Sequence, residues 1–212
     1  MSAEYSPPDD PLVILHQDHE ILVVDKPSGL LSVPGKSDHL ADCLMSRIRA
    51  AYPEALLVHR LDRDTSGVMV FALTPHAQRH LGLQFEKRQM KKTYVARLWG
   101  HLAEREGTVD LPLIVDWPNR PRQKVNLQEG KPSLTRYRVL DCNGDASRVE
   151  LEPVTGRTHQ LRLHMAAIGH PILGDVLYGG REAERLMLHA QMLSFMHPLG
   201  GERVTVESDV PF

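Results

Sequence analysis

The first apolar runs of the chain are short and are separated by turn residues. Residues 12–15 and 21–25 are rich in branched aliphatic side chains, which favour strands. The second run stops at Lys26-Pro27-Ser28-Gly29, where proline and glycine favour a turn. We therefore expect an early β-hairpin.

Two stretches with helical spacing follow. The first ends before Pro53, whose ring interrupts helical hydrogen bonding, and its apolar positions are Leu40, Leu44 and Ile48. The second comes after an apolar strand predicted at residues 68–73. It starts at Thr74-Pro75, a capping residue followed by proline at the first helical position. Its buried stripe is formed by Ala77, Leu81 and Phe85.

The second half of the chain is dominated by strand patterns. Residues 93–99 alternate, with Tyr94, Ala96 and Leu98 on one face. Further strands are expected at residues 134–140, 148–151, 186–193 and 203–206. A short helix is expected over Leu161, Met165 and Ile168, closed by Gly169. Because strands outnumber helices and do not alternate with them regularly, we expect an α+β fold with a mixed, mostly antiparallel β-sheet flanked by helices and loops.

Length and composition indicate one globular domain. The chain has 212 residues, of which 42% are hydrophobic and 25% charged, enough for a continuous core. We expect a flexible segment over residues 1–11 and a single catalytic domain over residues 12–212. The start lacks the features of a signal peptide, which favours a cytoplasmic location. Cys43 and Cys142 lie far apart in the sequence and predict neither a disulfide nor a zinc site.

The overall charge argues against a nucleic-acid partner, whereas its distribution does not. The formal net charge is −2, and nucleic-acid-binding chains usually carry a basic excess. The basic residues nevertheless cluster at residues 86–92, at residues 119–124 and around Arg157 and Arg162. A local field of this kind can serve a single site.

The segment 59–67, His-Arg-Leu-Asp-Arg-Asp-Thr-Ser-Gly, concentrates charge between the first helix and the next strand. Asp62 and Asp64 lie among arginines, which favour their ionised form, as a nucleophile or base requires. A salt-bridged polar loop without catalytic function is the alternative for such a pattern, because fixed charge pairs often serve only structure.

Two further segments combine aromatic or imidazole groups with cations. In residues 91–96 the Tyr94 phenol follows two lysines, although a strand tyrosine is more often a packing residue. In residues 156–164 helical geometry puts His159 and Arg162 on one face. The histidines 159, 164 and 170 lack the spacing of a metal-binding motif, so no metal is expected.

Taken in order, the three segments resemble the RluA family of pseudouridine synthases. The likeness rests on HRLDRDTSG, KKTYVARLWG and GRTHQLRLHMAAIGHPILGD, and VVDKPSGLLSVPG and LMLHAQMLSF extend it along the chain. LPLIVDWPNRPRQK and the lack of an N-terminal S4 domain resemble the short members that act on both 23S rRNA and the tRNA anticodon stem-loop. The resemblance implies the pseudouridine synthase fold with a central RNA-binding cleft, no cofactor, and RNA as the partner. We expect a monomer and no DNA partner. No apolar run approaches the roughly 20 residues of a membrane helix, so no membrane partner is expected.

The resemblance also implies roles for individual residues. Asp62 matches the catalytic aspartate, Tyr94 the ring that stacks on the target base, and Arg162 the basic partner of the aspartate. Arg60 matches the arginine that fills the space left by a flipped nucleotide. The other candidates for RNA contacts are His59, Lys91, Lys92, Arg120, Arg122, Lys124, Arg157 and His159.

Two other functional classes remain possible on the sequence alone. A non-catalytic RNA-binding module would need the basic clusters but not the combined Asp62, Tyr94 and Arg162. A glycoside-type hydrolase would use Asp62 and Asp64 as paired carboxylates. Within the synthase hypothesis, Asp62 could attack C1′ of the ribose or remove the C2′ proton, and the sequence is compatible with both.

Overall fold

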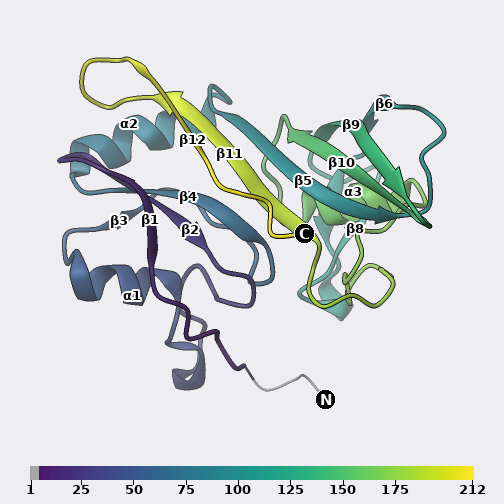
Figure 1. Cartoon of the computed structure of the whole chain (residues 1–212), viewed down its shortest axis with the longest axis horizontal. Helices are drawn as coiled ribbons and strands as arrows, with labels where there is room; N and C mark the ends of the chain where they lie inside the picture. The colour runs from purple at the N-terminus through teal and green to yellow at the C-terminus, as the bar shows by residue number, and fades with distance from the viewer. Residues whose placement is uncertain (1–4) are drawn as a thin grey trace. The chain divides into compact units, whose positions relative to one another are not determined.

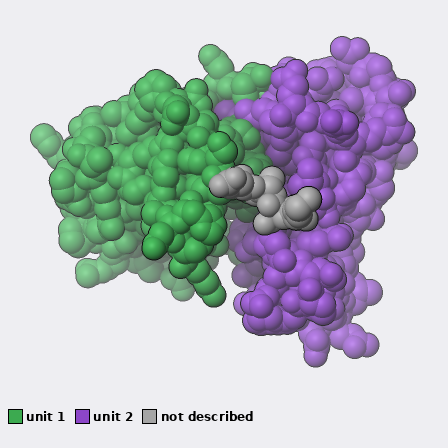
Figure 2. All heavy atoms as spheres, turned by 90° about the horizontal axis from the view of Figure 1, so that it is seen from below, with its two compact units in different colours: residues 1–92, 190–211 green, residues 93–189, 212 purple. Residues whose placement is uncertain are grey.

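The computed structural model describes residues 5–212 and divides the chain into two compact units. Unit 1 comprises residues 1–92 and 190–211, and unit 2 comprises residues 93–189 and 212 (Figure 2). The chain thus leaves unit 1 after Lys92 and returns to it after His189. Each unit has its own buried apolar cluster. A single catalytic domain over residues 12–212 stays a prediction.

Unit 1 is built from one sheet and two helices of the described chain (Figure 1). Its strands follow the order β1-β2-β4-β11, with β3 beside β4 and β12 beside β11. The elements are β1 (Val13–Gln17), β2 (Ile21–Lys26), the 3-10 turn η1 (Asp38–Leu40), α1 (Leu44–Ala51), β3 (Leu56–Leu57), β4 (Ser66–Ala72), α2 (Pro75–Glu86), β11 (Leu188–Met196) and β12 (Arg203–Glu207). The pairings β1–β2, β2–β4 and β11–β12 are antiparallel.

The early hairpin is confirmed. β1 and β2 pair with Val13 opposite Asp25, and the turn between them is closed by Asp18, whose Oδ1 accepts the backbone N–H groups of Glu20 and Ile21. Four consecutive residues of β2, 21–24, are fully buried. This strand therefore runs through the core of unit 1 and leads into the turn at residues 26–32.

Both predicted helices of unit 1 form, and the first starts later than its spacing suggests. Leu40 ends the preceding 3-10 turn, because Cys43 and Ser46 form a capping box that begins α1 at Leu44. In α2, Thr74 Oγ1 accepts the Ala77 N–H at 3.0 Å, as predicted for a capping threonine. Along the chain, α1 precedes and α2 follows the stretch 57–65.

Unit 2 contains a second run of antiparallel strands. β5 (Lys91–Trp99), β10 (Ala146–Pro153), β9 (Leu134–Asn143) and β6 (Glu106–Asp110) follow in this order, and β5 begins in the last residues of unit 1. Tyr94 lies opposite Leu151, and Ala96 opposite Val149. The α+β fold with a mostly antiparallel sheet is confirmed.

The predicted short helix is α3 (Gln160–Ala167), and its Leu161 and Met165 join the buried cluster with Ala96, Val149 and Leu151. Gly169 follows it with φ of 86°, a left-handed conformation that suits glycine. α3 therefore packs on the face of the sheet to which Tyr94 belongs.

Some short elements were not predicted. They are β3, β6, and the hairpin of β7 (Leu113–Val115) and β8 (Gln123–Val125), whose connecting turn includes η2 (Trp117–Asn119). These strands have two to five residues and little alternation, so their sequences carry no periodic signal.

The predicted flexible segment is only partly within the described residues. Residues 1–4 lie outside them. The Tyr5 hydroxyl donates to the Asp42 carbonyl at 2.9 Å and accepts the Leu31 N–H at 3.0 Å. Tyr5 is thus held against residues of unit 1.

Candidate active site

A fully buried lysine holds the loop that carries Asp62. Lys26, the last residue of β2, has no exposed surface, and its Nζ donates to the carbonyls of Pro27 at 2.9 Å, Arg63 at 2.8 Å and Thr65 at 2.8 Å. Burial of an ammonium group is costly unless it is hydrogen-bonded. These three acceptors compensate that cost and fix the backbone on the C-terminal side of Asp62.

The rest of the turn at residues 26–32 binds the same loop. Ser28 Oγ donates to the Asp64 carbonyl at 2.7 Å, and the Gly29 N–H donates to the Arg63 carbonyl at 3.0 Å. Ser32 Oγ donates to the Leu61 carbonyl at 2.7 Å and accepts the Leu61 N–H at 3.2 Å. The backbone of residues 61–65 is therefore fixed on both sides of Asp62.

The two carboxylates of the loop differ in their surroundings. The Arg63 guanidinium donates to both oxygens of Asp64, at 2.8 and 3.1 Å, and this pair is partly solvent-exposed. Asp62 is half-buried, and its carbonyl accepts the Thr65 N–H at 3.2 Å. Because the Asp64 carboxylate binds the Arg63 guanidinium, a catalytic pair of Asp62 and Asp64 is disfavoured. Arg60 is exposed at the start of the loop.

His59 is a packed residue rather than a surface cation. Its ring lies 4.6 Å from the Phe85 ring, and its Nε2 accepts the Val70 N–H at 3.1 Å. Burial, and secondarily the positive charge of Lys92, lower the pKa of His59 to about 3. The imidazole is therefore neutral at physiological pH, and its bond to β4 anchors the residue before Arg60.

Tyr94 lies on β5 at the border of the buried cluster of unit 2. Its side chain is half-buried and packs against that cluster. It shares a sheet face with Ala96 and Leu98, as the alternation predicted. The phenol therefore extends an apolar face while part of it stays accessible to a ligand.

Arg162 and Asp175 form a buried ion pair. Arg162 Nε donates to Asp175 Oδ2 at 2.7 Å and Nη2 to Oδ1 at 2.8 Å, and both side chains are almost completely buried. Asp175 Oδ1 also accepts the N–H groups of Leu177, at 2.9 Å, and Tyr178, at 3.2 Å. This two-point contact fixes the plane of the guanidinium.

Tyr178 connects His159 to the hairpin of β7 and β8. The Tyr178 hydroxyl accepts the Gln123 N–H at 2.8 Å, so its own proton can go to His159 Nδ1, which lies at 2.8 Å. His159 has φ of 53°, a left-handed conformation that is unusual for a residue other than glycine. The Arg162 guanidinium lies 5.5 Å from the centre of the Tyr178 ring. His159 and Arg162 therefore contact the same phenol, but not as neighbours on one helical face, because His159 is the left-handed N-cap that precedes α3.

Gln160 fixes the loop that contains Arg157. Its Oε1 accepts the Thr155 hydroxyl at 2.6 Å and the Arg157 N–H at 3.0 Å. Its Nε2 donates to the Leu134 carbonyl and the Thr135 hydroxyl, both at 3.0 Å. The buried amide thus ties residues 155–157 to β9, while the Arg157 side chain itself is exposed.

The predicted RNA contacts differ in accessibility. Arg60, Lys91, Arg120, Arg122, Lys124 and Arg157 are exposed, whereas His59, Lys92 and His159 are half-buried. Burial, followed by repulsion from Arg88, lowers the pKa of Lys92. The exposed cations are therefore the stronger candidates for phosphate contacts.

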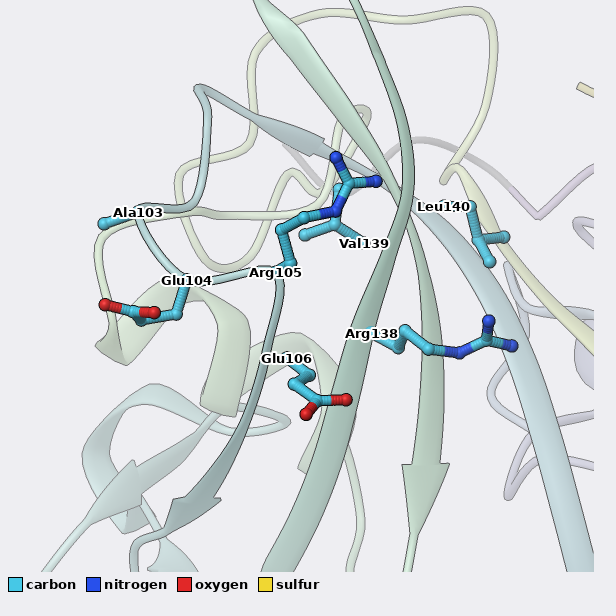
Figure 3. Close-up of a pocket in the computed structure, with 7 residues that line it drawn as sticks. All are labelled: Ala103, Glu104, Arg105, Glu106, Arg138, Val139 and Leu140. Atoms are coloured by element: carbon cyan, nitrogen blue, oxygen red, sulfur yellow. The ribbon is translucent and has the colours of Figure 1, made fainter.

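The predicted catalytic residues are divided between the two units. Asp62 belongs to unit 1, and Tyr94 and Arg162 belong to unit 2. A hollow of about 590 Å³ at the β6–β9 edge contains none of them. Figure 3 shows that it is lined by both signs of charge, with Glu104 and Glu106 beside Arg105 and Arg138. Arg138 also pairs with Glu150 at 3.1 Å, so this hollow does not present a uniform cationic surface.

No group of three or more His, Cys, Asp and Glu side chains within residues 5–212 is arranged to hold a metal ion. No helix of the described chain is long and apolar enough to cross a membrane.

Four supporting residues had no role in the predictions, namely Lys26, Gln160, Asp175 and Tyr178. The first three lie inside segments that carry the family resemblance, which was the only signal available for them. Several of their partners are distant in sequence, as with Lys26 and Arg63, 37 residues apart. Tyr178 lies just beyond the third segment and had no signal.

Comparison with known proteins extends over nearly the whole chain. Residues 20–167 match the family described as RNA pseudouridylate synthase. The dual-specificity RNA pseudouridine synthase RluA of Escherichia coli K12 is 55% identical over 98% of both chains. The protein of the same name from Yersinia pestis is 53% identical over 95% of this chain and 100% of its own length.

Solved structures agree with these sequence relationships. Human RNA pseudouridylate synthase domain containing 1 is 32% identical, with a TM-score of 0.81 over 98% of this chain and 87% of its own. Human RNA pseudouridylate synthase domain containing 4 is 26% identical, with a TM-score of 0.78 over 94% and 88% of the two chains. The family match over residues 20–167 and the near-complete overlap with its bacterial members establish that this chain belongs to the RNA pseudouridylate synthase family.

Proposed function

We propose that this protein converts uridine to pseudouridine in both 23S rRNA and the tRNA anticodon stem-loop, with Asp62 as the essential catalytic group. Bacterial relatives with dual specificity in their names, 55% and 53% identical, support two RNA substrates. The observation that carries the choice of Asp62 is the rigid loop around it. Its backbone is bound by Lys26 and Ser32, while the neighbouring Asp64 is engaged by Arg63.

The reaction breaks the N1–C1′ glycosidic bond of uridine and forms a C5–C1′ bond. A proton leaves C5 and N1 gains one, so the product is an isomer and the step needs no oxidant or reductant. The Asp62 carboxylate acts on the ribose, either by attack at C1′, which gives a glycosyl ester, or by removal of the C2′ proton, which gives a glycal. Both routes retain the detached uracil in the site until it rejoins the sugar.

Tyr94 and Arg162 act beside that carboxylate in this proposal. The Tyr94 ring stacks on the uracil, and its hydroxyl assists the transfer of the C5 proton. Arg162 keeps Asp62 ionised by a charge-assisted hydrogen bond. The two-point contact with Asp175 orients the guanidinium for this role, with Asp175 as a positioning residue.

The RNA must expose the ribose of the target uridine. Extruding a nucleotide from a stacked loop costs a few kcal/mol. Arg60, exposed at the start of the Asp62 loop, offsets part of this cost by filling the gap with its planar guanidinium. The exposed cations Lys91, Arg120, Arg122, Lys124 and Arg157 contact the phosphate backbone.

Asp62→Asn tests the proposal. The variant keeps the size of the side chain, so we expect unchanged binding of a tRNA anticodon stem-loop and complete loss of pseudouridine, measured by carbodiimide mapping. Asp64→Asn is the matched control and should retain activity. Pseudouridine formation by Asp62→Asn would reject the role of Asp62, and release of free uracil by the wild-type protein would favour a hydrolase. Site-resolved mapping of RNA from cells with and without the gene would identify the natural targets.

A further inference from the structure

The turn between β7 and β8 presents an indole to solvent. Trp117 has 67% of its surface exposed, although tryptophan is one of the side chains that most often contribute to buried or ligand-covered surfaces. It is the first residue of η2 and is separated from the end of β7 by Asp116. Such exposure of a large planar ring is typical of a binding site for another planar group.

Hydrogen bonds hold this turn, which we call the Trp117 turn (residues 116–122), in a defined shape. The Asp116 N–H donates to the Arg122 carbonyl at 3.0 Å, and the Arg122 N–H donates to the Asn119 carbonyl at 3.0 Å. Asn119 Nδ2 donates to Asp116 Oδ2 at 2.9 Å. The indole is therefore carried by an ordered support, which reduces the entropy lost when a ligand stacks on it.

One cationic side chain lies over the ring, and two more are exposed nearby in the sequence. The Arg120 guanidinium lies 4.7 Å from the centre of the Trp117 ring, and 67% of Trp117 is exposed with this arginine in place. The ring thus has room for a second planar group. Arg122 and Lys124 are also exposed, while the acidic Asp116 is half-buried and bound to Asn119. The accessible charge is positive, which suits a polyanion with planar bases.

The Trp117 turn is connected to the residues around Arg162. Gln123 follows the turn, and its N–H donates to the Tyr178 hydroxyl at 2.8 Å. The guanidinium groups of Arg122 and Arg162 lie 5.7 and 5.5 Å from the centre of the Tyr178 ring. An RNA segment bound at the turn would therefore lie on the same structural framework as the proposed catalytic arginine.

We propose that Trp117 stacks on an unpaired nucleobase outside the target uridine, while Arg120 and Arg122 contact the adjoining phosphates. The ligand class is single-stranded RNA, such as the loop of a stem-loop substrate. This inference rests on the proposed function and adds a second base-binding position to it. Stacking on an aromatic side chain is tolerant of base identity, so the position selects unpaired RNA rather than a particular base.

Substitution of Trp117 by leucine and by phenylalanine tests the stacking. Leucine keeps apolar bulk but removes the plane, so the Kd for a synthetic tRNA anticodon stem-loop should rise on the order of tenfold. Phenylalanine keeps a plane and should restore most of the affinity. A fully paired, blunt-ended RNA duplex of the same length should be bound equally by all three proteins. Leu199→Ala, a change at another exposed apolar residue, should have no effect.

A fluorescence measurement gives an independent readout. Trp99→Phe leaves Trp117 as the single tryptophan of the chain, so its emission should be quenched when the stem-loop binds. Unchanged emission, or equal affinity of Trp117→Leu and wild type, would overturn the inference even if the wild-type protein forms pseudouridine. Self-association that depends on Trp117, measured by sedimentation, would also overturn it. Absence of pseudouridine with intact quenching would instead reject the proposed function.

Discussion

The Arg162 guanidinium and the Asp175 carboxylate meet through two hydrogen bonds, at 2.7 and 2.8 Å, inside unit 2. Breaking a buried ion pair leaves an uncompensated charge, so Asp175→Asn should lower the free energy of unfolding by about 3 kcal/mol. Urea denaturation measures this. Adding Arg162→Met to Asp175→Asn should recover part of the loss without restoring activity. A double variant as unstable as the sum of both single variants would contradict the coupling.

Lys26→Met should loosen the loop that carries Asp62. The change removes the donor that binds three carbonyls, and each charged hydrogen bond contributes about 1.5–3 kcal/mol. We expect faster amide hydrogen exchange at Gly29 and Thr65, whose N–H groups bind Arg63 and Asp62 of this loop. The rate of pseudouridine formation should fall with little change in RNA affinity. Lys36→Met, at an exposed lysine, is the control, and equal exchange in both variants would contradict the role of Lys26 in fixing the loop.

Tyr94→Phe separates stacking from proton transfer. The ring remains, so the Kd for RNA should change less than about twofold, whereas the single-turnover rate should fall about a hundredfold if the hydroxyl transfers a proton. Rapid-quench measurements at saturating enzyme give this rate. Tyr52→Phe, which removes the hydroxyl that donates to Gln17, is the control. An undiminished rate in Tyr94→Phe would limit Tyr94 to stacking.

Arg60→Ala should affect folded RNA more than unstructured RNA. If the guanidinium replaces an extruded nucleotide, its loss should slow reaction on a stem-loop on the order of tenfold or more, because unstacking costs a few kcal/mol. An unstructured oligonucleotide with the same target should lose much less. Arg79→Ala, at an exposed arginine of α2, is the matched control. Equal losses on both RNAs would remove the role in extrusion.

His59 should make stability depend on pH in a defined window. Its folded-state pKa of about 3 lies below the value of about 6.5 expected for an unfolded chain. Between these values the unfolded chain binds the proton more strongly, so the free energy of unfolding should fall as the pH decreases from 6.5 toward 3. Denaturation curves of wild type and His59→Gln over this range measure the contribution. The variant should have the flatter profile, and parallel profiles would contradict the assignment.

The sequence predicted those features that local periodicity and capping control. The β1–β2 hairpin, the Thr74 cap of α2 and the alternation around Tyr94 all depend on neighbours within a few residues. The contacts that build the candidate site join distant positions, such as Lys26 with Arg63 and Gln160 with Leu134. No spacing rule encodes such pairs, because the fold and not the local pattern brings them together.

The candidate residues themselves were predicted by type, while their environments were not. The family motif distinguishes Asp62 from Asp64 in the sequence, whereas the contact of Arg63 with Asp64 is known only from the folded chain. In the sequence His59 looks like a possible cation beside Arg60, whereas in the folded chain its ring packs on Phe85. Burial and pairing decide protonation and reactivity, and both are properties of the folded chain.

The return of the chain to unit 1 after His189 has a consequence for synthesis on the ribosome. A Cβ at Gly67 would collide with the backbone of Ala190, so β4, which follows the Asp62 loop, packs closely against β11. The segment that carries Ala190 is made nearly at the end of translation. Residues 93–189 emerge and can fold before that segment exists. The nascent protein therefore completes the sheet beside the Asp62 loop late, after residues 93–189 have already been made.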